Sequence, residues 1–370
     1  MARPYAIALY GATGFTGSLT AHWLADHTDL QVCIAGRNEA KLLALQQALS
    51  RPLPIEVCTH EDPESMENLA ALTEVLLSTV GPYASYGIPV IEAAMKEGCH
   101  YLDITGEPAF VQQSRAQFDA IAKQKKLRIV HCCGFDSLPH DIGVYYTVKQ
   151  LPADADLTVR AYISSRGGIS GGTWNSALDA IASRERGPKV PPVSDHDAKI
   201  QARFHRSRVA HGWAVPLPTI DPVIVVRSAR ALRYGSSFRY GHYARIKTLR
   251  YLLGGALGVG AVVAAAQVPP LKRWLKKKLP SGAGPSREVR EAGWLKIHFV
   301  GEGGGQTVHT VLTADRDPGY AMTSRWVGLS AILLADADLP ERYGVLTPAV
   351  AMGDELIEKL PLTGTTITTV

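Results

Sequence analysis

The feature that most constrains the fold is an apolar stretch, residues 5–10, that leads directly into three evenly spaced glycines, Gly11, Gly14 and Gly17. A helical pattern follows them. In such a strand–turn–helix unit the first glycine permits a tight turn, the second lets the backbone approach phosphates, and the third lets the helix pack against the strand. Backbone N–H groups at the helix start then face an anion. The sequence therefore predicts a dinucleotide-binding loop.

The residue after the second expected strand indicates which dinucleotide is bound. That strand, 31–36, ends in Arg37, about twenty residues after the glycines. Folds that bind NAD place an acidic residue here to hold the ribose 2′-hydroxyl, whereas an arginine suits a 2′-phosphate. We therefore expect NADP(H) as the cofactor.

Strand and helix patterns alternate with little interruption up to about residue 135, which predicts an α/β fold with a doubly wound parallel sheet. Strands are expected at 5–10, 31–36, 54–59, 74–80, 99–104 and 128–133. Helices are expected at 14–27, 38–50, 63–71, 86–97 and 108–126. Ligands of such sheets lie at the carboxyl ends of the strands.

Three segments that follow expected strands are rich in polar residues or glycine: 78–83, 103–108 and 133–141. Each is explained either as a turn with a helix cap or as part of the cofactor site. Their convergence on the edge that carries the glycine loop favours a cofactor-lining role for the set.

The pattern changes beyond residue 150 and predicts a second, α+β domain built on a largely antiparallel sheet. Alternating strands are expected at 157–163, 222–228, 294–300 and 307–313. The glycine-rich segment 166–173, before an expected helix at 174–185, is either a second ligand-facing loop or a hairpin connection. A final helix is expected within 346–360.

Positive charge is concentrated in one part of the chain. Residues 201–290 contain seventeen Lys and Arg but two acidic residues, although the net charge of the whole chain is only +5. Such a block favours an anionic partner. Within it lies the uncharged segment 251–271, which has basic residues on both sides.

Basic flanks on both sides argue against a simple membrane span, because positive loops belong on one side of a bilayer. The alternatives are a helix at an anionic membrane surface, involving 245–278, and a buried helix that lines an apolar pocket. Nucleic acid fits poorly, because the charges frame an apolar segment without aromatic stacking residues.

The five cysteines, Cys33, Cys58, Cys99, Cys132 and Cys133, are expected to be free thiols in a reducing cytoplasm. No metal site is expected at 131–133, because successive strand residues point to opposite faces. The chain starts with a strand pattern and not with a signal peptide. We therefore expect a cytoplasmic protein, with peripheral attachment to the cytoplasmic membrane face as a further option.

The chain resembles the saccharopine dehydrogenase-like oxidoreductases, and within them the branch called trans-acting enoyl reductases. The resemblance is carried by the segments 11–17, 35–37, 80–83, 101–107, 133–137, 170–173 and 344–349. It implies a Rossmann domain at 1–140, a substrate and dimerisation domain at 141–340, and a segment at 341–370 that returns to the first domain. It also implies reduction of a C=C bond in a lipid-like or polyketide acyl chain presented by a synthase, and a possible homodimer.

Cofactor contacts are expected at Gly11, Ala12, Thr13, Gly14, Phe15, Thr16, Gly17, Arg37, Thr79, Val80, Gly81, Pro82, Thr105 and Gly106. The catalytic candidates are Tyr83, Asp136, Ser137 and His140, with Tyr83 the first choice of proton donor and His140 the second. One alternative is C–N chemistry on an amino acid, whose carboxylate would need Arg160, Arg166 or Arg227. The other is a non-catalytic NADP-binding protein attached to membranes.

Overall fold

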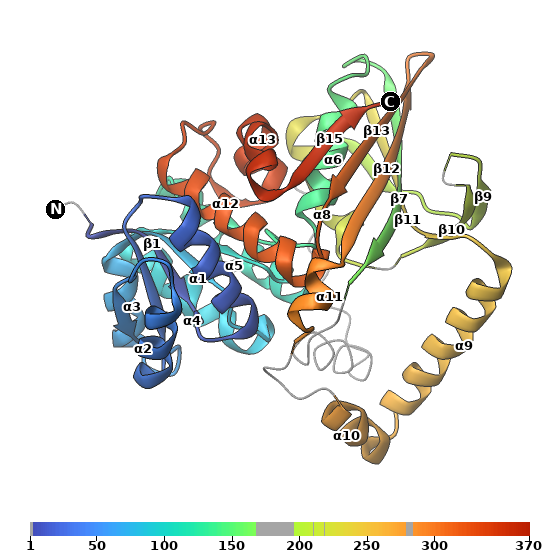
Figure 1. Ribbon diagram of the computed structural model, residues 1–370. Helices are drawn as coiled ribbons and strands as arrows, with labels where there is room; N and C mark the ends of the chain where they lie inside the picture. Colours follow the sequence, from blue (N-terminus) through green and yellow to red (C-terminus); the bar gives the residue numbers. More distant parts are fainter. Residues whose placement is uncertain (1–2, 168–195, 210, 218, 279–283) are drawn as a thin grey trace.

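The structure is a computed structural model, and it describes residues 3–167, 196–209, 211–217, 219–278 and 284–370. The loop 166–173, except for its first two residues, and the helix expected at 174–185 lie outside the described residues. Within the described part, the chain forms two sheets with helices packed on them (Figure 1).

The first sheet is entirely parallel, with seven described strands in the order β14-β6-β5-β4-β1-β2-β3. These strands are β1 (Tyr5–Tyr10), β2 (Val32–Gly36), β3 (Ile55–Val57), β4 (Thr73–Ser78), β5 (His100–Asp103), β6 (Arg128–Val130) and β14 (Gly344–Leu346). The helices between them are α1 (Phe15–His27), α2 (Glu39–Ala48), α3 (Pro63–Ala71), α4 (Tyr83–Glu97) and α5 (Pro108–Gln124). The predicted doubly wound sheet is confirmed.

The second sheet is mixed. Its described strands are β7 (Asp156–Arg166), β8 (Asp197–Ile200), β9 (His205–Ser207), β10 (Gly212–Pro216), β11 (Ser237–Ile246), β12 (Trp294–Gly303), β13 (Gln306–Ala314) and β15 (Thr365–Thr369). β7 and β8 pair with β11 in parallel, and the other described pairs are antiparallel. A Rossmann sheet joined to an α+β second domain is thus the observed fold class.

The remaining described helices and helical turns follow β6 in the chain. They are α6 (Leu138–Val148), α8 (Asp221–Leu232), α9 (Leu249–Ala266), α10 (Pro269–Lys278), α11 (Arg287–Glu291), the π-helical turn Pro318–Met322, α12 (Thr323–Asp336), α13 (Pro348–Lys359) and the 3₁₀ turn Leu360–Thr363. α12 packs on α1 and the first sheet, and α6 packs on the second sheet. The last part of the chain contributes to both sheets, because β14 pairs with β6 and β15 pairs with β13.

Two apolar cores hold the sheets. One contains Ile7, Trp23, Phe299 and Trp326, and it runs from one face of the first sheet to the second sheet. The other, with Tyr101 and Phe110, lies under α3, α4 and α5 on the opposite face. Burial on both faces explains why the first-sheet strands read as continuous apolar runs.

The strand predicted at 222–228 is wrong, because these residues belong to helix α8. The β-branched run of this segment resembles a strand, but Pro222 occupies the first turn of the helix, where its missing N–H costs nothing. The apolar residues Ile224, Val225 and Ala229 are buried on the helix. Tertiary packing therefore outweighs the local β propensity of the segment.

The uncharged segment forms α9, which extends away from the two sheets and is followed by α10 (Figure 1). Among the described residues, no helix is long and apolar enough to cross a membrane. The described side chains of α9 line neither of the two cavities discussed below. Val268, Leu271 and Trp274 are exposed apolar residues at and beyond its end.

Candidate active site

The glycine loop has the geometry of a phosphate-binding turn. Gly11 has a φ of +85°, which favours glycine, and a side chain at Gly17 would overlap the carbonyl oxygen of Gly11. Helix α1 begins at Phe15, and no side chain caps its N-terminus at Gly14. The first amide groups of α1 are therefore open to an anion, as pyrophosphate binding requires.

Two neighbouring features complete the fit to NADP(H). The Thr79 hydroxyl donates to the carbonyl oxygens of Tyr10 at 3.1 Å and Gly11 at 3.2 Å, so the loop after β4 is held against the glycine loop. Arg37 follows β2 directly and its side chain is exposed. The chain thus offers a cation, and no carboxylate, at the position where a 2′-phosphate would lie.

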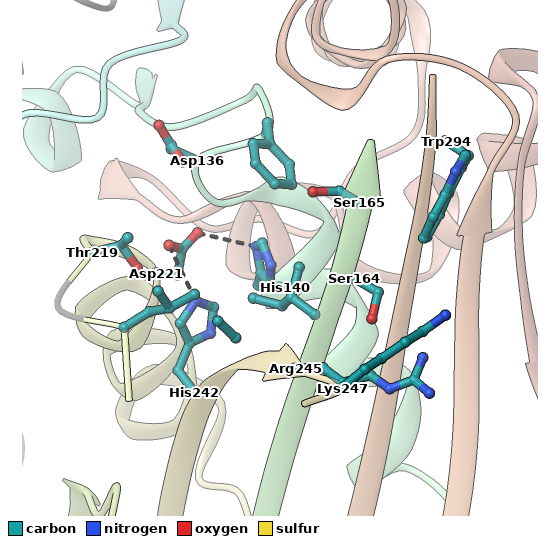
Figure 2. A pocket seen from close by; sticks show the side chains of 14 residues that line it. Asp136, His140, Ser164, Ser165, Thr219, Asp221, His242, Arg245, Lys247 and Trp294 are labelled. Carbon is teal, nitrogen blue, oxygen red and sulfur yellow. Dashed lines mark ion pairs between the residues drawn. The ribbon is translucent and has the colours of Figure 1, made fainter. Parts of the chain in front are cut away.

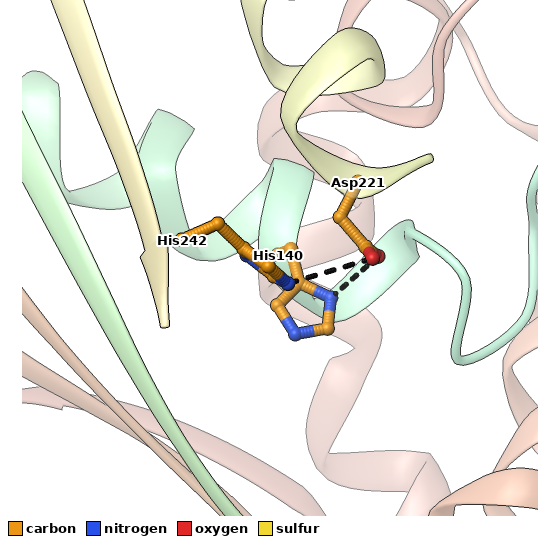
Figure 3. Close-up of side chains that lie close together, drawn as sticks. All are labelled: His140, Asp221 and His242. Carbon is orange, nitrogen blue, oxygen red and sulfur yellow. Dashed lines mark ion pairs between the residues drawn. The ribbon is translucent and has the colours of Figure 1, made fainter. Parts of the chain in front are cut away.

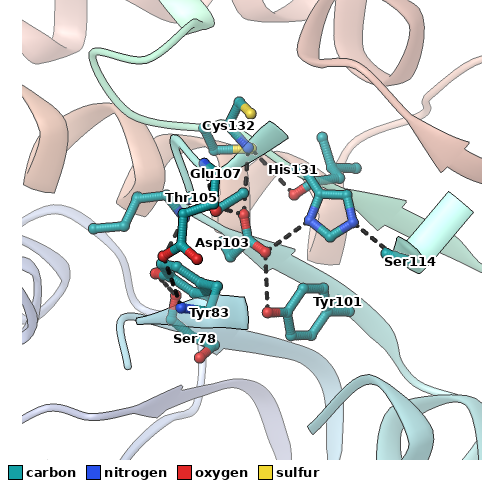
Figure 4. A network of polar contacts seen from close by, with 12 residues as sticks. Ser78, Tyr83, Tyr101, Asp103, Thr105, Glu107, Ser114, His131 and Cys132 are labelled. Atoms are coloured by element: carbon teal, nitrogen blue, oxygen red, sulfur yellow. Dashed lines mark hydrogen bonds and ion pairs between the residues drawn. The ribbon is translucent and has the colours of Figure 1, made fainter. Parts of the chain in front are cut away.

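A buried polar network centred on Asp103 joins the ends of β5 and β6 (Figure 4). Its Oδ2 accepts from the Tyr101 hydroxyl at 3.0 Å and lies 2.7 Å from His131 Nδ1. Its Oδ1 accepts from the amide groups of Thr105 and Cys132 at 3.0 and 3.3 Å. The network fixes two of the three loops that the sequence assigned to the cofactor edge, and it gives His131 a structural partner.

Tyr83 belongs to this buried layer (Figure 4). Its hydroxyl donates to the Ser78 carbonyl oxygen at 3.1 Å, and the Glu107 carboxylate accepts from the amide groups of Tyr83 and Ala84, both at 2.8 Å. Burial, followed by the charge of Asp103, raises the pKa of Tyr83 well above its usual value. These contacts make Tyr83 and Glu107 a clamp between the loops after β4 and β5.

A cavity of about 500 Å³, called here the central cavity, lies between the start of α6, the strands β7 and β11, and the start of α8 (Figure 2). Its lining residues are Phe135, Asp136, His140, Ile163, Ser164, Ser165, Leu217, Thr219, Asp221, His242, Ala244, Arg245, Lys247 and Trp294.

The central cavity adjoins the cofactor edge of the first sheet. A Cβ built on Gly106, in the loop after β5, would lie 2.9 Å from Asp136 Oδ2, so this carboxylate rests against that loop. Asp136 lines the cavity and is an exposed residue. Desolvation, followed by the negative charge of Asp221, raises its pKa to about 7.

Two histidines face one aspartate on the cavity wall (Figure 3). His140 Nδ1 lies 3.0 Å from Asp221 Oδ1, and His242 Nε2 lies 3.5 Å from Asp221 Oδ2. All three side chains are at most 2% exposed. The Tyr240 hydroxyl lies 3.0 Å from the other ring nitrogen of His242 and orients that ring.

Electrostatics distinguish the three groups. Burial alone would raise the pKa of Asp221, but the charge and hydrogen bond of His140 and the charge of His242 outweigh it, so the pKa lies well below its usual range. Burial lowers the pKa of His242 to about 3, so this ring is neutral near pH 7. An ionised carboxylate next to two imidazoles is an arrangement suited to orienting a proton donor.

The structure thus brings two of the four catalytic candidates into the central cavity, Asp136 and His140. Ser137 is the buried N-cap residue of α6 and does not line the cavity. Of the arginines considered for an amino acid carboxylate, Arg160 pairs with Glu302 at 2.8 Å, and none of the three lines the cavity.

Sequence reasoning missed Asp221 and His242. Asp221 directly precedes the segment 222–228 that was predicted as a strand, and its only local signal was an acidic residue before a proline at a helix start. His242 lies within β11, where nothing local marks it. In the described part of the chain, His140, Asp221 and His242 are also the group that could share a metal ion, since their ligand atoms lie within 4.8 Å of one another.

A parallel sheet whose strand ends carry a phosphate-binding loop beside a cavity with acid–base groups is typical of dinucleotide-dependent oxidoreductases. The profile of the saccharopine dehydrogenase NADP binding domain matches residues 7–130. The fold is similar to that of apo saccharopine dehydrogenase (L-Glu forming) from Saccharomyces cerevisiae, with a TM-score of 0.59 and 12% identity, covering 99% of this chain and 100% of that one.

Closer relatives identify the branch. The chain is 34% identical over 412 residues to a protein of Mycobacterium tuberculosis named as a candidate trans-acting enoyl reductase, covering 99% of this chain and 98% of the relative. It is 31% identical over 417 residues to the trans-acting enoyl reductase of Mycobacterium ulcerans, covering 99% and 97%. The chain therefore belongs to the saccharopine dehydrogenase-like oxidoreductases, in the trans-acting enoyl reductase branch. The expected cofactor, NADP(H), is confirmed.

Proposed function

We propose that the protein reduces the C=C bond of an α,β-unsaturated acyl chain, lipid-like or polyketide, that a separate synthase presents. The observation that carries this proposal is the position of the central cavity, which connects the loop at Gly106 with the His140–Asp221–His242 group. Its walls include Phe135, Ile163 and Leu217. Apolar walls with a few convergent polar groups suit an acyl chain.

The protein's own contribution is to hold both reactants and to supply a proton. Bound NADPH supplies a hydride, which would reach the β-carbon of the substrate. The loops after β1, β4 and β5 and Arg37 would hold the nucleotide through Gly11–Gly17, Thr79–Pro82 and Thr105–Gly106.

His140 is the proton donor that we favour, for a proton that must reach the α-carbon. Asp221 Oδ1 lies 3.0 Å from its Nδ1, and both ring nitrogens are buried without a hydrogen-bond partner among the described residues. Asp221 would therefore orient the ring, and Nε2 would face the substrate. Asp136, at the end of the cavity beside Gly106, would position the acyl carbonyl through the hydrogen bond that its neutral form can donate.

The proposed activity is tested with purified protein, NADPH and a 2-enoyl thioester of medium chain length. We expect loss of NADPH absorbance together with formation of the saturated thioester, detected by mass spectrometry. The saturated thioester is the matched control and should give no turnover. Turnover with an amino acid and a 2-oxo acid, but not with the enoyl thioester, would contradict the proposal and favour C–N chemistry.

We further propose that α9 and α10 attach the protein to an anionic membrane surface. Val268, Leu271 and Trp274 are 43%, 46% and 55% exposed, and Lys272 and Arg273 lie among them. Apolar side chains that enter the headgroup region next to cations are typical of interfacial helices.

This attachment predicts the behaviour of Trp274→Ser. The variant should lower the partition coefficient for phosphatidylserine vesicles, measured by flotation, about thirtyfold, because an indole buried at the interface contributes about 2 kcal/mol. Leu362→Ser is the matched control, because Leu362 is 62% exposed but lies outside α9 and α10, between α13 and β15. Equal flotation of wild type and Trp274→Ser would contradict the attachment.

A further inference from the structure

A second cavity, of about 420 Å³, lies between α5 and α8 and is called here the α5–α8 cavity. α5 packs on the first sheet, whereas α8 packs on the second. Arg115 comes from α5, Lys199 from β8, and Arg227 and Arg230 from α8. The cavity therefore lies where the two domains meet, and its basic side chains come from both of them.

The described lining of this cavity carries a net positive charge. Among the described residues, the lining includes four basic side chains and no Asp or Glu. Lys199 pairs with Asp197 at 2.8 Å, but Asp197 is shared with Arg239 at 2.6 Å. Within the described ranges, neither Arg115 nor Arg227 pairs with a carboxylate. Burial, followed by the like charge of Arg115, lowers the pKa of Arg227 to about 10.

The Arg227 guanidinium is held in place but only partly bonded. Its Nη2 donates to the carbonyl oxygen of Val345 at 2.8 Å, and its Nη1 is buried without a hydrogen-bond partner. A buried N–H group of this kind costs free energy unless a further acceptor reaches it. An oxyanion between Arg227 and Arg115 would supply that acceptor and offset the repulsion between the two cations.

The other walls are mostly apolar, with Gln112 as the polar exception. Val111 of α5 and Ile220, Val223 and Val226 of the α8 region line the same space. A small inorganic anion would leave these surfaces uncovered, whereas a ligand with an apolar chain would cover them.

We propose that the α5–α8 cavity binds an amphiphilic oxyanion, with its carboxylate or phosphate headgroup between Arg115 and Arg227 and its apolar chain against α8. Guanidinium groups bind both headgroups through paired N–H donors. Such a ligand would contact both α5, which packs on the first sheet, and α8, which packs on the second. The site is separate from the central cavity and does not depend on the reaction proposed for it.

The test is isothermal titration calorimetry of the full-length protein saturated with NADPH. The ligands, titrated separately, are decanoate, decyl phosphate and inorganic phosphate. At least one amphiphile should bind about tenfold or more tightly than inorganic phosphate, and the stronger of the two identifies the headgroup. Arg115→Gln should weaken that binding about tenfold or more, because one charge-assisted contact is lost. Arg208→Gln, which removes an exposed arginine near β9, is the matched control and should bind normally.

Two further variants exclude other binding places. Val223→Glu brings a negative charge into the cavity and should also weaken binding, whereas Trp274→Ser, on α10, should not change it. Absence of binding by both amphiphiles would overturn the proposal. Binding that is unaltered in Arg115→Gln and Val223→Glu, or inorganic phosphate that binds as tightly as decyl phosphate, would also overturn it.

Discussion

Replacement of His140 by asparagine is expected to lower kcat about 10²- to 10⁴-fold, the usual contribution of a positioned general acid. NADPH affinity should be unchanged, because His140 lies in the central cavity and not in the glycine loop. Asparagine keeps a polar side chain next to Asp221 but cannot carry the proton. The measurement is kcat and KM for the enoyl thioester, with NADPH binding followed separately by nucleotide fluorescence.

The matched comparison is Tyr83→Phe, which removes the proton donor first favoured on the sequence. The Tyr83 hydroxyl already donates to the Ser78 carbonyl oxygen and lies outside the cavity lining. We therefore expect this variant to retain turnover within about threefold, since it loses one neutral hydrogen bond. A large loss of kcat in Tyr83→Phe with an active His140→Asn would reverse the assignment and restore Tyr83 as the donor.

The His140 prediction also separates the proton role from a metal role. The atoms of His140, Asp221 and His242 are close enough to share an ion. If they did so in the active protein, a chelator would abolish the wild-type activity, and His140→Asn would lose bound metal by elemental analysis. A proton donor held by Asp221 predicts activity that is insensitive to chelation.

The fold of the first domain can be predicted well from the sequence, for a physical reason. Its strands are short and apolar, and its helices follow after a few residues. Gly11 is required by its positive φ, and Gly17 by its close approach to the Gly11 carbonyl oxygen within the same local unit. Local periodicity and turn chemistry therefore determine most of that sheet.

The active site is less accessible from the sequence, because it is assembled over long separations. His140, Asp221 and His242 come from α6, α8 and β11, and only packing brings them together. A β-branched run that resembles a strand conceals the start of α8, so Asp221 carries no reliable local signal. Tyr83 is the opposite case. It lies in a predicted cofactor loop and was therefore a catalytic candidate, but its hydroxyl makes a hydrogen bond within the fold.

Replacement of Arg37 by aspartate should weaken NADPH binding about 100-fold or more. A charge-assisted bond to phosphate contributes about 1.5–3 kcal/mol, and the aspartate adds repulsion to its loss. NADH binding should change little or improve, because a carboxylate at this position can accept a hydrogen bond from the ribose 2′-hydroxyl. Nucleotide fluorescence titrations of both cofactors with both proteins give the four dissociation constants required.

Lys41→Asp provides the control for general electrostatics, because Lys41 is exposed in the first turn of α2, close to Arg37 in sequence, and the substitution changes net charge equally. The preference of this variant for NADPH over NADH should stay within about threefold of the wild-type preference, as expected for a screened surface charge. Arg37→Gln should fall between wild type and Arg37→Asp, because it removes attraction without adding repulsion. If all three variants kept the wild-type preference, residues other than Arg37 would hold the 2′-phosphate. Selectivity would then have to come from the loop residues Thr13–Thr16. Substitution of these residues one at a time would identify which of them is responsible.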